Sequence, residues 1–97
     1  MANVELRDNA LHFSGQLDRD TVPQLWQMRT QWVSQVQQVV LDLAKVSRVD
    51  SAGMALMIHL VNEFKTAGVD VNARNVPEEL VTLLRLSHAE SLLPIAE

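Results

Sequence analysis

The chain has 97 residues and a formal net charge of -4 at pH 7, with 47% hydrophobic and 21% charged residues. This length and composition predict one globular domain spanning residues 1–97. The weakly acidic balance argues against broad binding of nucleic acids or anionic membranes, since both depend on Lys and Arg. The absence of cysteine excludes disulfides, thiol catalysis and Cys-ligated metals.

The N-terminal residues predict no signal peptide, because no basic segment precedes an apolar run. The longest apolar stretch, Met54–Ile58, is interrupted by His59 and is too short to span a bilayer. We therefore expect a cytoplasmic protein that does not insert into the membrane and reaches it only through a partner.

The first predicted elements are a β-hairpin and an amphipathic helix. Apolar and polar residues alternate on both sides of the Asp8–Asn9 pair, and Gly15 ends the second run. Apolar residues then recur at helical spacing over Thr21–Ser34, where Asp18 or Asp20 can supply the N-terminal cap.

The middle of the chain predicts a strand followed by the most apolar helix. The continuous run Val39–Leu43 is typical of a strand buried on both faces, and Ala44–Val49 is interpreted as a connector. A helix is predicted from the Asp50–Gly53 segment to about Ala67, with Gly68 as its stop.

The remaining residues predict a short strand, a third helix and an apolar tail. Val69–Arg74 alternates as a strand does, a helix starts at Pro77, and Ser91–Ile95 is apolar enough to pack against the domain. The order β-β-α-β-α-β-α predicts an α/β fold. Its mixed sheet has about four strands, an N-terminal hairpin and parallel crossovers through helices.

No catalytic, metal or cofactor site is predicted. His12, His59 and His88 lack a neighbouring ligand at metal-binding spacing, and the chain has no Gly-rich phosphate loop. The aspartates are interpreted as helix caps and strand ends. No pair of nucleophile and base is visible, so we expect a protein that binds another protein rather than an enzyme.

Ser51 stands out because it lies at the start of the most apolar helix. At that place a serine caps the free backbone amides, but the same amides and the positive helix end also suit a phosphate. At 100° per residue, Met54, Ala55 and Ile58 lie on the side of the helix below Ser51, away from its core-facing stripe. A neighbouring helix or the tail covers them, or they form an apolar docking patch with Ser51 at its rim.

The first predicted helix, Thr21–Ser34, also carries more apolar surface than contact with the sheet requires. Arg29 lies inside an apolar arc that includes Trp26. Either the arginine stem packs on the core while its head reaches water or an Asp, or both residues belong to an interface, where Trp and Arg are enriched.

The chain resembles the STAS domain, the fold shared by sulfate transporter tails and anti-sigma factor antagonists. The resemblance covers nearly the whole chain and lies in Phe13–Asp18, Val40–Leu43 and Val49–Leu56; Asp50-Ser51-Ala52-Gly53 is its most specific part. In anti-sigma factor antagonists, a partner kinase phosphorylates the serine at the Ser51 position. Ala52 departs from the Ser or Thr that follows it there.

Three segments are more similar to the small STAS subunit of the Mla-type ABC phospholipid transporters of Gram-negative bacteria: Leu25–Arg29, Val46–Gly53 and Ala55–Leu60. This resemblance implies a subunit without cofactors that binds the cytoplasmic ATPase and, through it, the permease complex at the inner membrane. It also implies a role in outer-membrane lipid asymmetry. The resemblance implies that Ser51 lies in the ATPase-binding surface. Combined with the helix faces described above, it leads us to expect that this surface consists of Ser51, Met54, Ala55 and Ile58, extended by Trp26 and Arg29. The alternative is an anti-sigma factor antagonist with Ser51 as its phosphosite.

Overall fold

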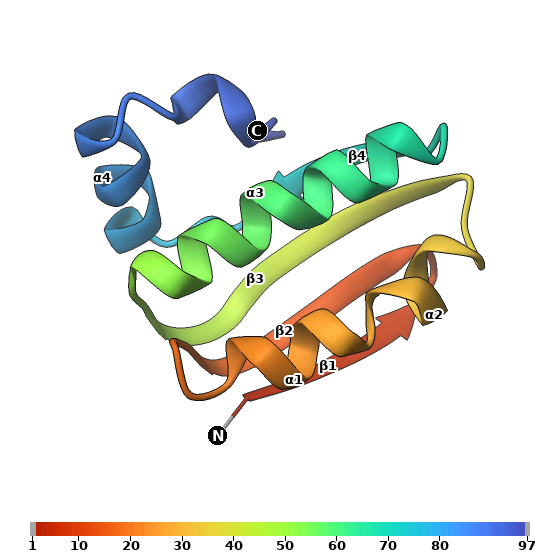
Figure 1. Cartoon of the computed structure of the whole chain (residues 1–97), viewed down its shortest axis with the longest axis horizontal. Coiled ribbons are helices and arrows are strands. Elements are labelled where there is room, and N and C mark those ends of the chain that lie inside the picture. Colours follow the sequence, from red (N-terminus) through yellow and green to blue (C-terminus); the bar gives the residue numbers. More distant parts are fainter. Residues whose placement is uncertain (1, 97) are drawn as a thin grey trace.

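The computed structural model describes residues 2–96 and contains a mixed sheet of four strands. β1 (Ala2–Arg7) pairs antiparallel with β2 (Ala10–Leu17), and β2 pairs parallel with β3 (Gln38–Val49), which pairs parallel with β4 (Asp70–Arg74). The spatial order therefore follows the chain order (Figure 1). The predicted hairpin and parallel crossovers are confirmed.

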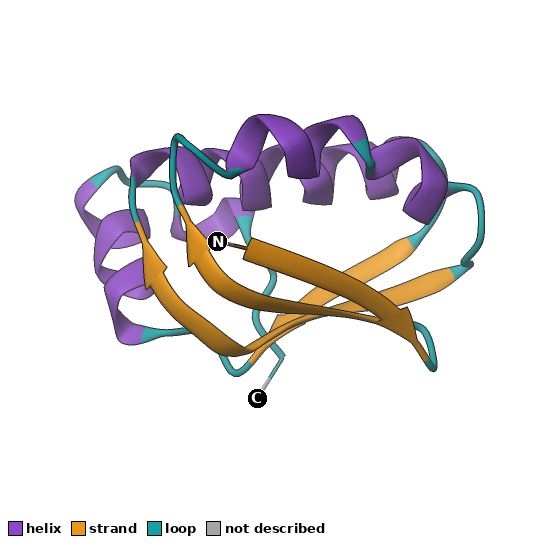
Figure 2. Cartoon of the chain, turned by 90° about the horizontal axis from the view of Figure 1, so that it is seen from below, coloured by secondary structure: helices purple, strands orange, loops and turns teal. Residues whose placement is uncertain are grey.

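The helices that follow the strands cover one face of this sheet. They are α1 (Val22–Gln27), α2 (Arg29–Val33), α3 (Ser51–Thr66), α4 (Glu78–Leu86) and the 3₁₀ turn η1 (Glu90–Leu92). Figure 2 shows α1, α2 and α3 on one side of the strands and α4 beside the strand ends, while the opposite sheet face stays uncovered. Within residues 2–96, no helix is both long and apolar enough to cross a membrane.

The hairpin turn forms where the sequence predicts it. Asp8 and Asn9 adopt φ angles of 51° and 63°, the left-handed conformation that a two-residue hairpin turn requires and that Asp and Asn tolerate. The prediction that Gly15 ends β2 is wrong. Gly15 has a φ of 85° beside a register shift against β3, and the strand continues to Leu17.

β3 differs from its prediction in two ways. The segment Ala44–Val49, interpreted as a connector, is the second half of a twelve-residue strand that pairs with β2 up to Leu17. The strand is also not buried on both faces. Leu41 and Leu43 are buried under the helices, whereas Asp42 faces the uncovered side and is only half-buried. Because β3 continues to Val49, one residue alone separates it from α3.

The predicted helix Thr21–Ser34 is divided at Met28 into α1 and α2. The Arg29 side chain donates from Nη1 to the Trp26 carbonyl at 3.0 Å, and a continuous helix would use that carbonyl for the amide four residues later. Before α1, the Asp18 carboxylate accepts from the Thr21 amide at 3.1 Å, so Asp18 rather than Asp20 orders the turn.

The core lies between the sheet and α3. Leu56, Met57, Leu60, Val61 and Phe64 form the buried stripe of α3, as predicted from the helical spacing. The C-terminal tail also packs back as predicted. Its Leu93 is buried, and the β4 residue Ala73 donates to the Pro94 carbonyl at 2.7 Å, so the tail borders the β4 edge of the sheet.

Gly53 sets the distance between α3 and the sheet. A Cβ at this position would collide with the Leu17 carbonyl oxygen and lie 2.9 Å from both the Leu17 Cβ and the Val49 Cγ1. A backbone oxygen cannot rotate away as the end of a side chain can. Gly53 therefore allows the first turn of α3 to approach the ends of β2 and β3 closely.

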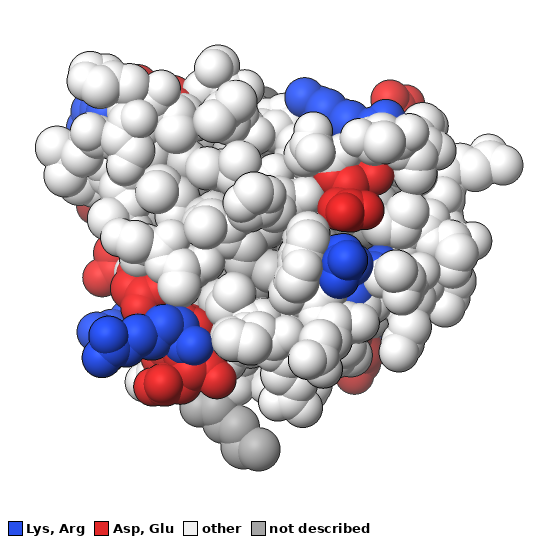
Figure 3. Space-filling view, in the orientation of Figure 1, with Lys and Arg blue, Asp and Glu red and all other residues white. Residues whose placement is uncertain are grey.

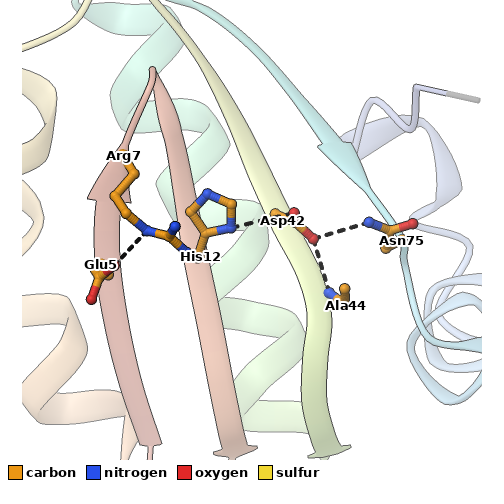
Figure 4. Close-up of polar contacts among 6 residues, drawn as sticks. All are labelled: Glu5, Arg7, His12, Asp42, Ala44 and Asn75. Carbon is orange, nitrogen blue, oxygen red and sulfur yellow. Dashed lines mark hydrogen bonds and ion pairs between the residues drawn. The ribbon is translucent and has the colours of Figure 1, made fainter.

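The uncovered sheet face carries a row of charged and polar side chains. The strand register places Glu5 opposite His12, His12 opposite Asp42, and Asp42 opposite Arg74. Figure 4 shows Arg7 paired with Glu5 on β1, while His12 points toward Asp42, with Nδ1 3.4 Å from Oδ2.

Asp42 is the centre of this row. Burial by itself raises the pKa of its carboxyl, but the Asn75 side chain and the Ala44 amide donate to it at 3.1 Å and 3.0 Å and lower the pKa. The charges of His12 and Arg74 lower it further, so the pKa of Asp42 lies below its ordinary value of 3.8.

The first prediction concerns Gly53. Gly53→Ala should lower the melting temperature, because overpacking costs about 1–3 kcal/mol, and the rigid Leu17 carbonyl places the cost at the upper end. The helix propensity of Ala returns only about 1 kcal/mol. The exposed Thr66→Ala is the control in the same helix. Equal melting temperatures for Gly53→Ala and wild type would contradict the close approach.

The second prediction concerns Asp42. Since its pKa is lower in the folded state, its charge stabilises the fold above about pH 4, and that contribution is lost as the pH falls through the folded-state pKa. Asp42→Asn should therefore be less stable than wild type by about 1 kcal/mol at neutral pH, and the difference should shrink as the pH falls below about 4 and through the folded-state pKa of Asp42. Urea unfolding across this range measures it, with the exposed Asp70→Asn as control. A difference independent of pH would refute the explanation.

Candidate functional site

The start of α3 presents Ser51 to solvent. The Asp50 carboxylate accepts from the amides of Ala52 and Gly53 at 2.9 Å and 3.1 Å, so Asp50 is the N-cap. Ser51 is the first residue of the helix and is exposed. The expectation that Ser51 caps the helix is therefore wrong, because the preceding carboxylate already binds these amides.

Two neighbouring elements fix the backbone around Ser51. The second Asp50 oxygen accepts from the Arg19 amide at 3.4 Å, which joins the loop after β2 to the start of α3. On the other side, the Glu79 carboxylate of α4 accepts from the Val49 amide at 2.7 Å. Ser51 thus follows a backbone segment that the loop after β2 and the first turn of α4 hold in place.

The predicted patch residues lie on the same helix as Ser51. Met54, Ala55 and Ile58 are half-buried, and Met54 and Ile58 also pack against the core. No Asp, Glu, Lys or Arg occurs in α3 before Glu63. Figure 3 shows the helix side as largely uncharged, with charged atoms gathered at the lower left, along the upper margin and in an acidic–basic pair right of centre.

Trp26 and Arg29 connect α1 and α2 to α3. The Arg29 guanidinium lies over the Trp26 ring, 4.1 Å from its centroid, and its Nε is 3.5 Å from the Glu63 carboxylate. The Trp26 ring also meets the His59 ring edge-on, with centroids 5.9 Å apart. Arg29 therefore braces a half-buried tryptophan while its head lies beside an acid of α3, and its place in an interface stays a prediction.

A hollow between α1 and α3 brings Trp26 and Ala55 together. Its lining is completed by residues that the sequence analysis did not propose for a site: Val22, Pro23, Leu56 and His59. The sequence did contain a signal for two of these residues. His59 follows Ala55 by four residues and Pro23 precedes Trp26 by three, and residues at these spacings are neighbours on a helix surface. Local spacing does not indicate that α1 and α3 face one another across the hollow, because this arrangement depends on the whole fold.

The described residues form no cluster suited to a metal ion. Over residues 2–96, no group of three His, Cys, Asp or Glu side chains lies close enough to hold one. His12 lies on the uncovered sheet face, His59 beside Trp26, and His88 just after α4.

Comparisons with known proteins identify the family of this chain. The family described as "Mlab, STAS domain" matches residues 2–94. The protein named "Intermembrane phospholipid transport system binding protein MlaB" is 38% identical over 78 residues in both Escherichia coli (strain K12) and Shigella flexneri, covering 80% of this chain and 78% of each relative.

Solved structures of anti-sigma factor antagonists have the same fold. SpoIIAA in its unphosphorylated form aligns with a TM-score of 0.73 and 17% identity over 100% of this chain and 89% of its own. An antagonist from Mycobacterium paratuberculosis aligns with a TM-score of 0.72 and 24% identity over 98% of this chain and 83% of its own. The predicted STAS-like fold is confirmed, and the chain belongs to the MlaB-type STAS domain family.

Proposed function

We propose that this chain is a non-enzymatic accessory subunit of an ABC phospholipid transporter and binds its cytoplasmic ATPase subunit. The observation that carries the proposal is the 38% identity to proteins named for intermembrane phospholipid transport, which extends over 80% of the chain. The subunit then lies at the cytoplasmic side of the inner membrane through its partner, and it supports assembly and activity of a transporter that maintains outer-membrane lipid asymmetry.

The proposed docking surface is the outward side of α3 with the adjoining part of α1. It comprises Ser51, Met54, Ala55 and Ile58, with Trp26 beside them. Exposure of Ser51 and the lack of charge along this stretch of α3 support it, because interface centres are poor in charged residues and methionine adapts to a partner surface.

Arg29 has a supporting part in this proposal. Its guanidinium stacks on Trp26, donates to the Trp26 carbonyl and lies beside Glu63, so its charge is already engaged within the chain. Arg29 then serves the interface by bracing Trp26 against α3 rather than by reaching the ATPase itself.

The alternative function is that of an anti-sigma factor antagonist regulated by phosphorylation of Ser51. The fold likeness to SpoIIAA and the exposed serine at a helix start favour it. Neighbouring genes separate the two functions, because the transporter function requires genes for an ABC ATPase and a permease, whereas the antagonist requires a serine kinase gene.

The third prediction tests the docking surface at Ser51. Ser51→Asp should fold as stably as wild type, because Asp50 keeps the cap and the positive helix end tolerates a carboxylate. An unpaired charge inside a desolvated interface should weaken ATPase binding by about 2–5 kcal/mol. Co-purification with the ATPase subunit, read beside a melting curve, measures both effects.

Ser91→Asp is the matched control, since Ser91 is exposed in η1, outside the proposed surface. It should bind the ATPase as wild type does. A folded Ser51→Asp that binds with wild-type affinity would remove the support for this docking surface. Failure of the wild-type chain to bind the ATPase would refute the proposed function itself.

The fourth prediction concerns the brace. Arg29→Ala should lower the free energy of unfolding by about 1 kcal/mol, because it removes a cation–π contact and packing of the arginine stem. Arg29→Lys should restore the free energy of unfolding only in part, since Lys has no planar guanidinium that could stack on the Trp26 ring. Denaturant unfolding measures both. If Arg29→Ala is as stable as wild type, Arg29 does not brace Trp26. Arg29 would then be interpreted as a residue that contacts the ATPase directly.

A further inference from the structure

The two edges of the sheet are closed to different degrees. At the β4 edge, Ala73 donates to the Pro94 carbonyl at 2.7 Å and accepts from the Ala96 amide at 2.8 Å, so the C-terminal tail occupies part of that edge. At the opposite margin, β2 is the only strand within residues 2–96 that pairs with β1 (Figure 1). The outer side of β1 is therefore open to a further strand.

The register of the hairpin shows which backbone groups of β1 point outward. Arg7 and Ala10 flank the two-residue turn and form a hydrogen-bonded pair. Such pairs alternate along an antiparallel ladder, so Glu5 and Asn3 also bond to β2. The other β1 residues present their amides and carbonyls at the open edge: Ala2, Val4 and Leu6.

β1 lacks the features that usually keep edge strands apart. Edge strands are protected by Pro, by Lys, by a bulge or by charges that point inward. The segment Ala2–Arg7 contains neither Pro nor Lys, and it pairs with β2 along its whole length without a register shift. Its charged residues, Glu5 and Arg7, pair with each other on the uncovered sheet face. The open edge itself is bordered by apolar residues that pack only partly against the core.

The β1 sequence is complementary to a second copy of itself. A two-fold axis at Val4 places Val4 opposite Val4 of the second copy and Ala2 opposite Leu6. Every residue whose amide points outward then has a hydrogen-bonding partner, and the facing side chains are apolar. On the other sheet face, Asn3 lies opposite Glu5, where its amide can donate to the carboxylate.

Other two-fold pairings of β1 are less favourable. An axis at Glu5 sets two carboxylates opposite each other, which is destabilising, and places Ala2 opposite Asp8. An axis at Leu6 places Val4 opposite Asp8 and leaves Ala2 without a partner. Asp8 belongs to the turn, with a φ of 51°, and does not continue a ladder. The axis at Val4 alone uses the whole open edge without opposing like charges.

We propose that β1 pairs antiparallel with β1 of a second copy of this chain, about a two-fold axis at Val4. The pairing joins two four-stranded sheets into one continuous sheet. Because the axis is perpendicular to the sheet, the helices of both copies lie on the same face. One strand per copy makes a small interface, so we expect a weak dimer. The proposal does not depend on the proposed transporter function.

The first test uses single cysteines, because the chain has none of its own. Cα atoms of a hydrogen-bonded antiparallel pair are about 5.5 Å apart, a distance that a disulfide can span. Val4→Cys should therefore form a disulfide-linked dimer in a glutathione buffer. Leu6→Cys is the matched control, because Leu6 is also half-buried but lies about 13 Å along the strands from its own copy. It should remain largely unlinked.

The second test measures dimerisation by sedimentation without a covalent bond. Wild type should form dimers as its concentration rises. Val4→Pro removes the outward amide but leaves the bonds to β2, and Val4→Ala is its control because it also shortens the side chain but keeps the amide. Val4→Pro should raise the dissociation constant of the dimer at least about tenfold relative to Val4→Ala. Melting curves show whether both variants fold.

The outcomes are decisive for the edge contact. Wild type that remains monomeric up to about 1 mM would overturn the proposal. A dimer that folded Val4→Pro leaves unchanged would also overturn it, because the contact would then lie elsewhere. Cross-linking of Leu6→Cys as readily as Val4→Cys would refute the axis at Val4. If Val4→Pro does not fold, the cysteine test decides alone. Binding to the ATPase tests the proposed function separately.

Discussion

The close approach of Gly53 to the Leu17 carbonyl is the constraint on which the helix side depends. It places the first turn of α3 directly against the ends of β2 and β3, and any side chain at this position would push the helix outward. Asp50 then joins the same helix start to the Arg19 amide. The position of Ser51 relative to α1, and hence the hollow between the helices, follows from these contacts rather than from side chains at the surface.

The one-sided packing of the sheet separates two kinds of surface. The helix side combines a buried core with outward residues that are largely uncharged, while the opposite face carries the row from Glu5 through His12 and Asp42 to Arg74. Neighbours in this row carry opposite charges when His12 is protonated, which stabilises pairing across strands. The uncovered face can thus remain in water.

Local signals predicted most of the fold. The Asp8–Asn9 turn, the apolar stripe of α3 and the order of strands and helices depend on residues close in sequence. The second half of β3 was missed because Lys45, Ser47 and Arg48 are exposed and polar, so their pattern is that of a loop. The hollow between α1 and α3 was missed because Trp26 and His59 are far apart in the chain, and their contact exists only once α1 and α3 pack together.

The residues of the segment Asp50–Gly53 have different structural roles. Asp50 binds the amides of Ala52 and Gly53, and Gly53 supplies the close contact with Leu17. Ser51 is therefore free of both structural tasks, although capping is what its position alone suggested. A hydroxyl that the fold does not need, held at a fixed place beside an apolar hollow, is available for recognition. Changes at Ser51 should therefore leave the fold intact, which allows the proposed effect on binding to be measured separately.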